Sequence, residues 1–137
     1  MSKVDNFLSE WHRVVAGKDR EALFGLLAED VSMGAPPYFE KLRGRDVVQH
    51  LLGLILHTID EFTYQREWQN QGELALEFTG RVGELRLQGI DLISLDDDFV
   101  VWNLDVLIRP MNALEALREI IAPQMTAYLS RADQGSV

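Results

Sequence analysis

Residues 84–110 limit what this chain can fold into more than any other stretch. They read ELRLQGIDLISLDDDFVVWNLDVLIRP, with apolar residues at alternate positions on both sides of an acidic turn. Because successive side chains of a strand point to opposite faces, this alternation predicts two long antiparallel strands joined by that turn. The segment also carries Asp91 and Asp105, at positions where a soluble sheet normally buries apolar side chains.

The length of the turn decides whether Asp91 and Asp105 share a face of the sheet. A two-residue loop, Asp97-Asp98, places them on opposite faces, whereas a three-residue loop, residues 97–99, places them side by side. Two-residue loops favour Asn-Gly or Asp-Gly, and this turn contains no glycine. We therefore favour the longer loop and a shared face as our working hypothesis.

The second strand predicts two environments for the sheet. Its even positions are all apolar, and we interpret them as a packing surface that forms a homodimer interface through Trp102, Leu104 and Val106. Its odd positions are mixed and include Asn103 and Asp105. This mixed face is typical of a cavity lined by a few polar groups.

The rest of the chain predicts a single domain over residues 1–130 with a frayed tail at 131–137. Periodicity and capping residues predict four helices. The first covers residues 2–15, the second is short and begins at Asp19, and the third covers about 45–58. The fourth begins at a capping box of Asn112 with Glu115 and is interrupted at Pro123. Strands are predicted at 31–35, 61–69 and 73–82. Helices gathered on one face of an antiparallel sheet make an α+β fold, and a curved sheet wrapped in this way encloses a conical space.

Charge and composition exclude several classes of protein. A net charge of −9 argues against a nucleic-acid partner, because phosphates are repelled. The chain has no cysteine, so neither disulfides nor thiolate metal sites are expected. No apolar run approaches the roughly 18 residues of a membrane span, and the first residues lack the apolar core of a signal peptide. We expect a cytoplasmic protein without a membrane partner.

The order of the segments resembles the SnoaL-like branch of the NTF2-like superfamily. The resemblance is carried by FLSEWHRVVAGKDREALFGLLAEDV, LRGRDVVQHLL, GIDLISLDDD and VLIRP followed by ALEAL, which together span nearly the whole chain. It implies a conical fold around a small-molecule cavity, often in a homodimer packed through the sheets. The superfamily includes polyketide cyclases, ketosteroid isomerases and limonene-epoxide hydrolases, as well as members without known chemistry.

Residue by residue, the resemblance to the isomerases is partial. Asp91 falls where they keep a protonated aspartic acid that donates to the substrate oxyanion, and Trp11 falls where they keep a hydrogen-bonding tyrosine. Ala35 falls where they keep the general-base aspartate, which argues against steroid isomerisation. Asp105 falls near a catalytic aspartate of the epoxide hydrolases.

The candidate catalytic residues are Asp91 and Asp105. Burial of one carboxylate beside another raises the pKa of one of them, so that a neutral acid and an ionised base can work as a pair. The simpler interpretation is that each pairs with an arginine or with backbone N–H groups. The residues expected to line the pocket are Trp11, Tyr38, His57, Trp68 and Asn103.

Neither a metal nor a cofactor is predicted. His50 and His57 are seven residues apart on one helix, which is not the close pair of a helical zinc site. Two hypotheses remain. The chain binds a small apolar molecule and catalyses acid–base chemistry on it, such as cyclisation, isomerisation, hydration or epoxide opening. Alternatively, it is a non-catalytic ligand-binding or dimeric assembly module.

Overall fold

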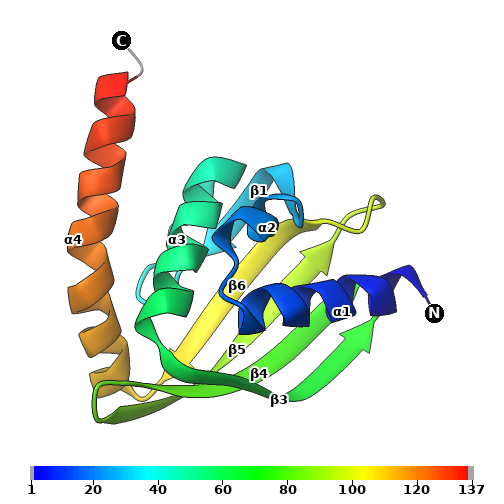
Figure 1. Ribbon diagram of the computed structural model, residues 1–137, viewed down its shortest axis with the longest axis horizontal. Coiled ribbons are helices and arrows are strands. Elements are labelled where there is room, and N and C mark those ends of the chain that lie inside the picture. The colour runs from blue at the N-terminus through cyan, green and yellow to red at the C-terminus, as the bar shows by residue number, and fades with distance from the viewer. Residues whose placement is uncertain (1, 136–137) are drawn as a thin grey trace.

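A computed structural model describes residues 2–135 of the chain. Figure 1 shows one sheet with helices packed around it. In chain order the elements are α1 Lys3–Ala16, α2 Arg20–Phe24, β1 Leu27–Gly34, β2 Leu42–Arg43, α3 Arg45–Thr58, β3 Asp60–Asn70, β4 Glu73–Val82, β5 Leu85–Leu95, β6 Val101–Arg109 and α4 Met111–Gly135.

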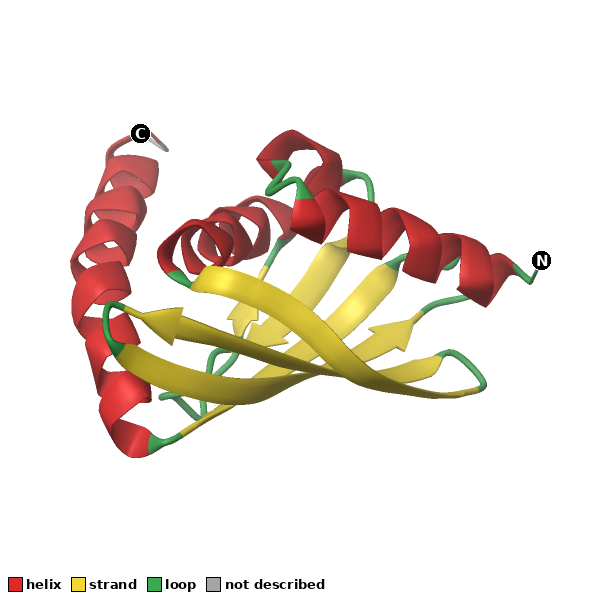
Figure 2. Ribbon diagram, turned by 60° about the horizontal axis from the view of Figure 1, so that its bottom comes forward, coloured by secondary structure: helices red, strands yellow, loops and turns green. Residues whose placement is uncertain are grey.

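The six strands form a single curved sheet in the order β2-β1-β6-β5-β4-β3. Only β1 and β6 run parallel, and every other neighbouring pair is antiparallel. Helices α1, α2 and α3 cover one face, which we call the inner face, and leave the outer face uncovered (Figure 2). This arrangement confirms the predicted α+β fold.

The first helices begin where their capping residues predict. The Ser2 hydroxyl accepts a hydrogen bond from the backbone N–H of Asp5 at 3.1 Å, and the Asp19 carboxylate accepts one from Ala22 at 3.1 Å. Each side chain satisfies a backbone donor that has no partner inside its helix. The apolar faces of α1 and α3 then pack onto the inner face of the sheet and form the core.

The last helix differs from its prediction. α4 begins at Met111, and the Pro110 carbonyl accepts the first helical bond from Leu114 at 3.1 Å. Asn112 therefore lies inside the first turn and is not the N-cap, although its side-chain oxygen accepts from the backbone N–H of Ala113 at 2.8 Å. The helix continues past Pro123, where the chain is exposed and water can satisfy the carbonyl that the proline leaves unpaired. It reaches Gly135, so of the predicted tail only residues 136 and 137 lie outside the described part.

The central hairpin has the predicted three-residue loop but not the predicted register. The Asp96 carbonyl accepts from Phe99 N–H at 3.0 Å, and Phe99 adopts a φ of 60°, as the third residue of such loops does. Leu95 pairs with Val101, but Ser94 pairs with Asn103. Trp102 is thus an extra residue, a β-bulge that shifts every later pair by one position.

None of the helices within residues 2–135 is both long and apolar enough to cross a lipid bilayer.

Candidate functional site

Asp91 lies on the inner face of β5, in a small chamber between the sheet and helices α1, α2 and α3. The chamber has a volume of about 20 Å³, which is space for a single water molecule. Only 6% of Asp91 is exposed. The residues that line the chamber are otherwise almost all apolar or aromatic: Trp11, Val15, Leu23, Leu52, Ile55, Leu56, Phe62, Tyr64, Phe78 and Val106.

A chain of hydrogen bonds from three elements ends at Asp91. The indole N–H of Trp11 on α1 donates to the Tyr64 hydroxyl on β3 at 3.0 Å. That hydroxyl donates to Oδ2 of Asp91 on β5 at 2.6 Å. Trp11 is buried, so its single donor is directed and fixed by packing. Trp11 therefore positions Tyr64, and Tyr64 is the group that contacts the carboxyl.

Burial controls the protonation of this pair. It raises the pKa of Asp91 from 3.8 to about 7, because the charged carboxylate loses its hydration, while the hydrogen bond from Tyr64 lowers that pKa in part. The pKa of Tyr64 is raised well above 10.0 by burial and by the neighbouring Asp91. At neutral pH, Asp91 is therefore divided between its acid and its carboxylate, while Tyr64 stays a donor.

A glycine on β5 shapes the wall of the chamber. Gly89 pairs with Phe78 across β4 and β5, and a Cβ at Gly89 would lie 2.3 Å from the end of the Phe78 ring. The ring can therefore lie against the bare backbone of β5, two residues from Asp91. Phe62 stacks on Phe78 at 4.6 Å between ring centroids, which closes this side to water.

Asp105 lies on the opposite face of the sheet, so the predicted shared face is wrong. With the three-residue loop alone, Asp91 would pair with Asp105, but the bulge at Trp102 pairs Asp91 with Val106 and Leu92 with Asp105. Asp105 forms an ion pair with Lys41 at 3.1 Å, with both side chains about one third exposed. It also accepts a hydrogen bond from Asn103 at 3.1 Å.

The same bulge exchanges the two faces predicted for β6. Leu104 and Val106 are 0% and 5% exposed and belong to the core of the single chain, so they cannot form a subunit interface. Asn103 lies on the outer face, where its side-chain carbonyl accepts from Ser32 and from Lys41, both at 2.8 Å. Trp102 is 48% exposed.

The other predicted pocket residues separate into different places. Trp68 is 48% exposed and shares an outer-face groove with Asp105, away from Asp91. His57 is exposed in the last turn of α3 and lines neither the chamber nor the outer cavity described next. Trp11 lines the chamber around Asp91. The sequence analysis did not select Tyr64, although its alternation with Phe62 on β3 is a signal of a shared inward face.

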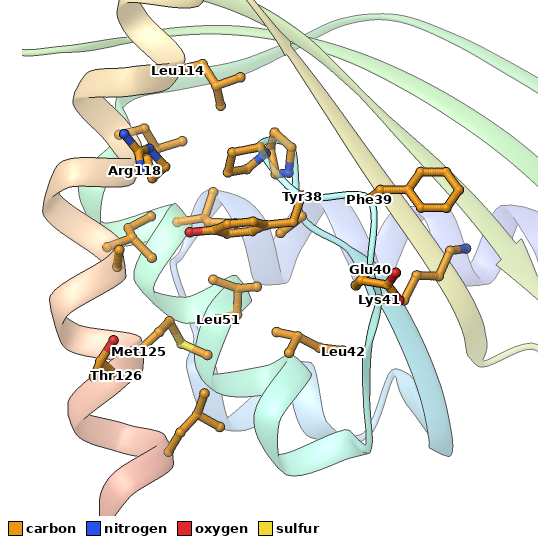
Figure 3. A pocket seen from close by; sticks show the side chains of 18 residues that line it. Tyr38, Phe39, Glu40, Lys41, Leu42, Leu51, Leu114, Arg118, Met125 and Thr126 are labelled. Carbon is orange, nitrogen blue, oxygen red and sulfur yellow. The ribbon is translucent and has the colours of Figure 1, made fainter.

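Tyr38 lines a second and larger space, which we call the outer cavity. It measures about 450 Å³ and is bounded by residues 35–42, α3 and α4. Figure 3 shows the Tyr38 ring across it with the hydroxyl turned toward α4, while Phe39 points away. Ala35 also lines this cavity, and Ile55 of α3 borders both it and the Asp91 chamber.

Comparisons with known proteins identify similar structures. A crystal structure of a steroid delta-isomerase from Pseudomonas aeruginosa is 33% identical, with a TM-score of 0.88 over 95% of this chain and 96% of that one. An uncharacterised protein with a cystatin-like fold from Silicibacter pomeroyi is 35% identical, with a TM-score of 0.82 over 90% of this chain and 85% of that one.

More distant structures share the fold alone. An NTF2-like protein of unknown function from Burkholderia xenovorans is 16% identical, with a TM-score of 0.66 over 77% of this chain and 82% of that one. No protein-family model matches the sequence. No curated protein matches it either.

Proposed function

Because this chain belongs to the NTF2-like superfamily of proteins with a cystatin-like fold, we propose that it binds a small, mostly apolar molecule at Asp91 and transfers a proton to an oxygen of that molecule. The observation that carries the proposal is a buried carboxyl with a pKa near neutrality, held by Tyr64 at the end of a hydrogen-bond chain. Such a group is matched to acid catalysis at physiological pH.

In the proposed reaction Asp91 is the acid, and Tyr64 is the hydrogen-bond donor to its carboxyl group. Neutral Asp91 donates its proton to a carbonyl or epoxide oxygen, and the carboxylate that remains is stabilised by the Tyr64 hydroxyl. Tyr64 keeps its own proton because its pKa lies well above 10.0. The walls are apolar and leave space for about one water molecule, so these hydrogen bonds act in a medium of low dielectric constant.

The name of the Pseudomonas relative supports proton transfer at an oxygen, but a difference at one position argues against the same reaction. Ala35, where the resemblance places the general base of the isomerases, has no group that can take a proton. The chamber residues include no second carboxyl. Opening of an epoxide fits this site better than a proton shuttle between two carbons. Asp91 protonates the ring oxygen as its bond to carbon breaks, a water molecule adds to that carbon, and the proton that this water releases restores neutral Asp91.

A substrate has to open the chamber, because about 20 Å³ does not admit one. Ile55 forms the partition between the chamber and the outer cavity, so we propose that a substrate reaches Asp91 by displacing this side chain. The rest of the wall is formed by residues of α1, α2, α3 and the strands that belong to the core or pack against it.

The proposal is tested by turnover of small enones, epoxides and polyketide-like esters by the wild type and by Asp91→Asn. The wild type is expected to lose kcat/KM as pH rises through about 7, because the reaction needs protonated Asp91. Asp91→Asn is expected to lose activity while remaining folded. An active Asp91→Asn variant, or a pH profile without this decline, would contradict the mechanism.

The second candidate is a dimeric assembly or binding module without chemistry. It is supported by the uncovered outer face, where Trp68, Leu92 and Leu107 are 48%, 39% and 51% exposed. We propose that two copies pair through this face. Sedimentation is expected to give a dimer at micromolar concentration and a monomer for Leu92→Lys. A monomeric wild type would exclude the dimer. If Asp91→Asn is stable and no activity is found for the wild type, a binding module without catalysis is favoured.

A further inference from the structure

The outer cavity is an elongated apolar space with one wall formed by α4. Leu114, Leu117, Ile121, Met125 and Leu129 line it at intervals of three or four residues, so they share one stripe of the helix. From Leu114 to Leu129 this stripe is about 22 Å long at a rise of about 1.5 Å per residue. Leu51 and Ile55 of α3 form the facing wall.

Contacts toward both ends fix the position of α4. Near the start of α4, Ala113, Leu117 and Ile121 are buried in the core. Toward its far end the Tyr128 ring stacks on His50 of α3, with centroids 4.0 Å apart and planes 11° from parallel. Between these contacts the segment with Pro36 and Pro37 fills only part of the gap. The space is therefore built into the packing of the two helices.

One wall of the cavity carries a positive charge on the exposed residue Arg118. Arg118 lines the cavity from α4, and it takes part in none of the ion pairs found among residues 2–131. Figure 3 shows Arg118 and the Tyr38 hydroxyl toward the α4 wall, and Glu40 and Lys41 at the opposite end. Lys41 is engaged with Asp105. In a chain of net charge −9, this guanidinium stands out as a site for an anion.

We propose that the outer cavity binds an elongated apolar molecule that ends in a carboxylate, in the manner of a fatty acid. The carboxylate accepts hydrogen bonds from Arg118 and from the Tyr38 hydroxyl, and the tail lies along Leu51, Ile55 and Met125. The volume of about 450 Å³ is within the usual range for small-molecule sites. The inference does not rest on catalysis at Asp91, which lies beyond Ile55.

Calorimetric titration of the full chain with dodecanoate, and with dodecanol as its neutral match, tests the role of Arg118. The wild type is expected to bind both and to prefer dodecanoate. Arg118→Gln is expected to weaken dodecanoate binding about tenfold or more, as for a hydrogen bond between charged groups, and to leave dodecanol binding unchanged. Arg86→Gln, on the far side of the sheet, is the matched control. Equal loss of both ligands in Arg118→Gln, or no binding of either by the wild type, would overturn the proposal.

A blocking variant tests the location. Ala122→Trp places an indole in the cavity and is expected to abolish binding of both ligands, whereas Ala127→Trp, on an exposed part of α4 that does not line the cavity, is the control. If Ala122→Trp does not fold, Thr126→Trp blocks the cavity from an exposed position. Asp91→Asn is expected to bind dodecanoate as the wild type does, whether or not Asp91 is catalytic. If a folded Trp variant binds both ligands as the wild type does, the outer cavity is not the binding site. A cavity filled by a second copy of the chain would also contradict the proposal.

Discussion

Replacing Asp91 by Asn is expected to make the protein more stable at neutral and alkaline pH and to change little at acidic pH. The folded chain holds the pKa of Asp91 at about 7, against 3.8 in the unfolded chain. Between these values the folded state binds more protons than the unfolded state, so stability falls as pH rises. The stability gained by keeping Asp91 neutral is therefore complete below the pKa of Asp91 in the unfolded chain. It is lost as pH rises through the pKa of Asp91 in the folded chain.

The size of the effect follows from the same two values. A difference of about 3 pKa units at about 1.36 kcal/mol each gives roughly 4 kcal/mol. This is an order-of-magnitude value, and it is not reduced for exposure because Asp91 is only 6% exposed. Asn keeps the shape and can still accept the Tyr64 hydrogen bond, but it never becomes charged. The variant therefore avoids the cost of burying a carboxylate.

Urea unfolding followed by tryptophan fluorescence measures this effect at a series of pH values. The difference in the free energy of unfolding, Asp91→Asn minus wild type, is expected to rise by about 4 kcal/mol between about pH 4 and pH 8. Asp105→Asn is the matched control, since it alters a carboxyl of the same strand pair on the outer face. A difference for Asp91→Asn that stays flat across this range would refute the reasoning, because Asp91 would then be solvated or paired with a cation.

Other substitutions give sharper tests of individual contacts. Tyr64→Phe removes the hydrogen bond that lowers the pKa of Asp91, so a carbon-detected NMR titration is expected to show that pKa above its wild-type value. An unchanged pKa would mean that the Tyr64 hydroxyl does not act on Asp91. Gly89→Ala places a methyl group 2.3 Å from the Phe78 ring and is expected to cost about 1–3 kcal/mol in urea unfolding, whereas the exposed Gly25→Ala, with its nearest neighbouring atom at 3.8 Å, involves no such contact. Lys41→Ala breaks an ion pair with Asp105 in which both side chains are about one third exposed, and it is expected to cost less than about 1 kcal/mol; a larger loss would mean that the outer-face cluster is buried in an assembly.

Patterns among residues close together in the sequence predict most of the fold. Apolar periodicity locates α1 and α3, because each helix carries its own buried stripe. The Ser2 cap also marks the start of α1, whereas Gly44 gives α3 no side-chain cap. Alternation locates β4 and β5 and predicts the burial of Asp91. The start of α4 is missed because Pro110 supplies the first acceptor through its backbone, and a carbonyl leaves no mark in the sequence.

The candidate site is less predictable, because it depends on contacts between distant elements. The partners of Asp91 come from α1 and β3, and Trp11 and Tyr64 are 53 residues apart in the chain. Alternation places Tyr64 and Phe62 on one face of β3, but it does not show that the Tyr64 hydroxyl meets Trp11 and Asp91. The outer cavity is equally non-local, since residues 35–42, α3 and α4 together form its walls.

A single inserted residue, Trp102, decides which chemistry the hairpin can support. Without it the three-residue loop would pair the two aspartates in one cavity, and their mutual repulsion would favour a shared proton. With it, Asp105 faces outward to Lys41, while Leu104 and Val106 complete the core. The apolar set of β6 can face inward only in the bulged register, because a one-residue slip would expose all of it. Core packing thus fixes the bulge, and the bulge leaves Asp91 as a solitary buried acid, for which a one-carboxyl mechanism is the consistent chemistry.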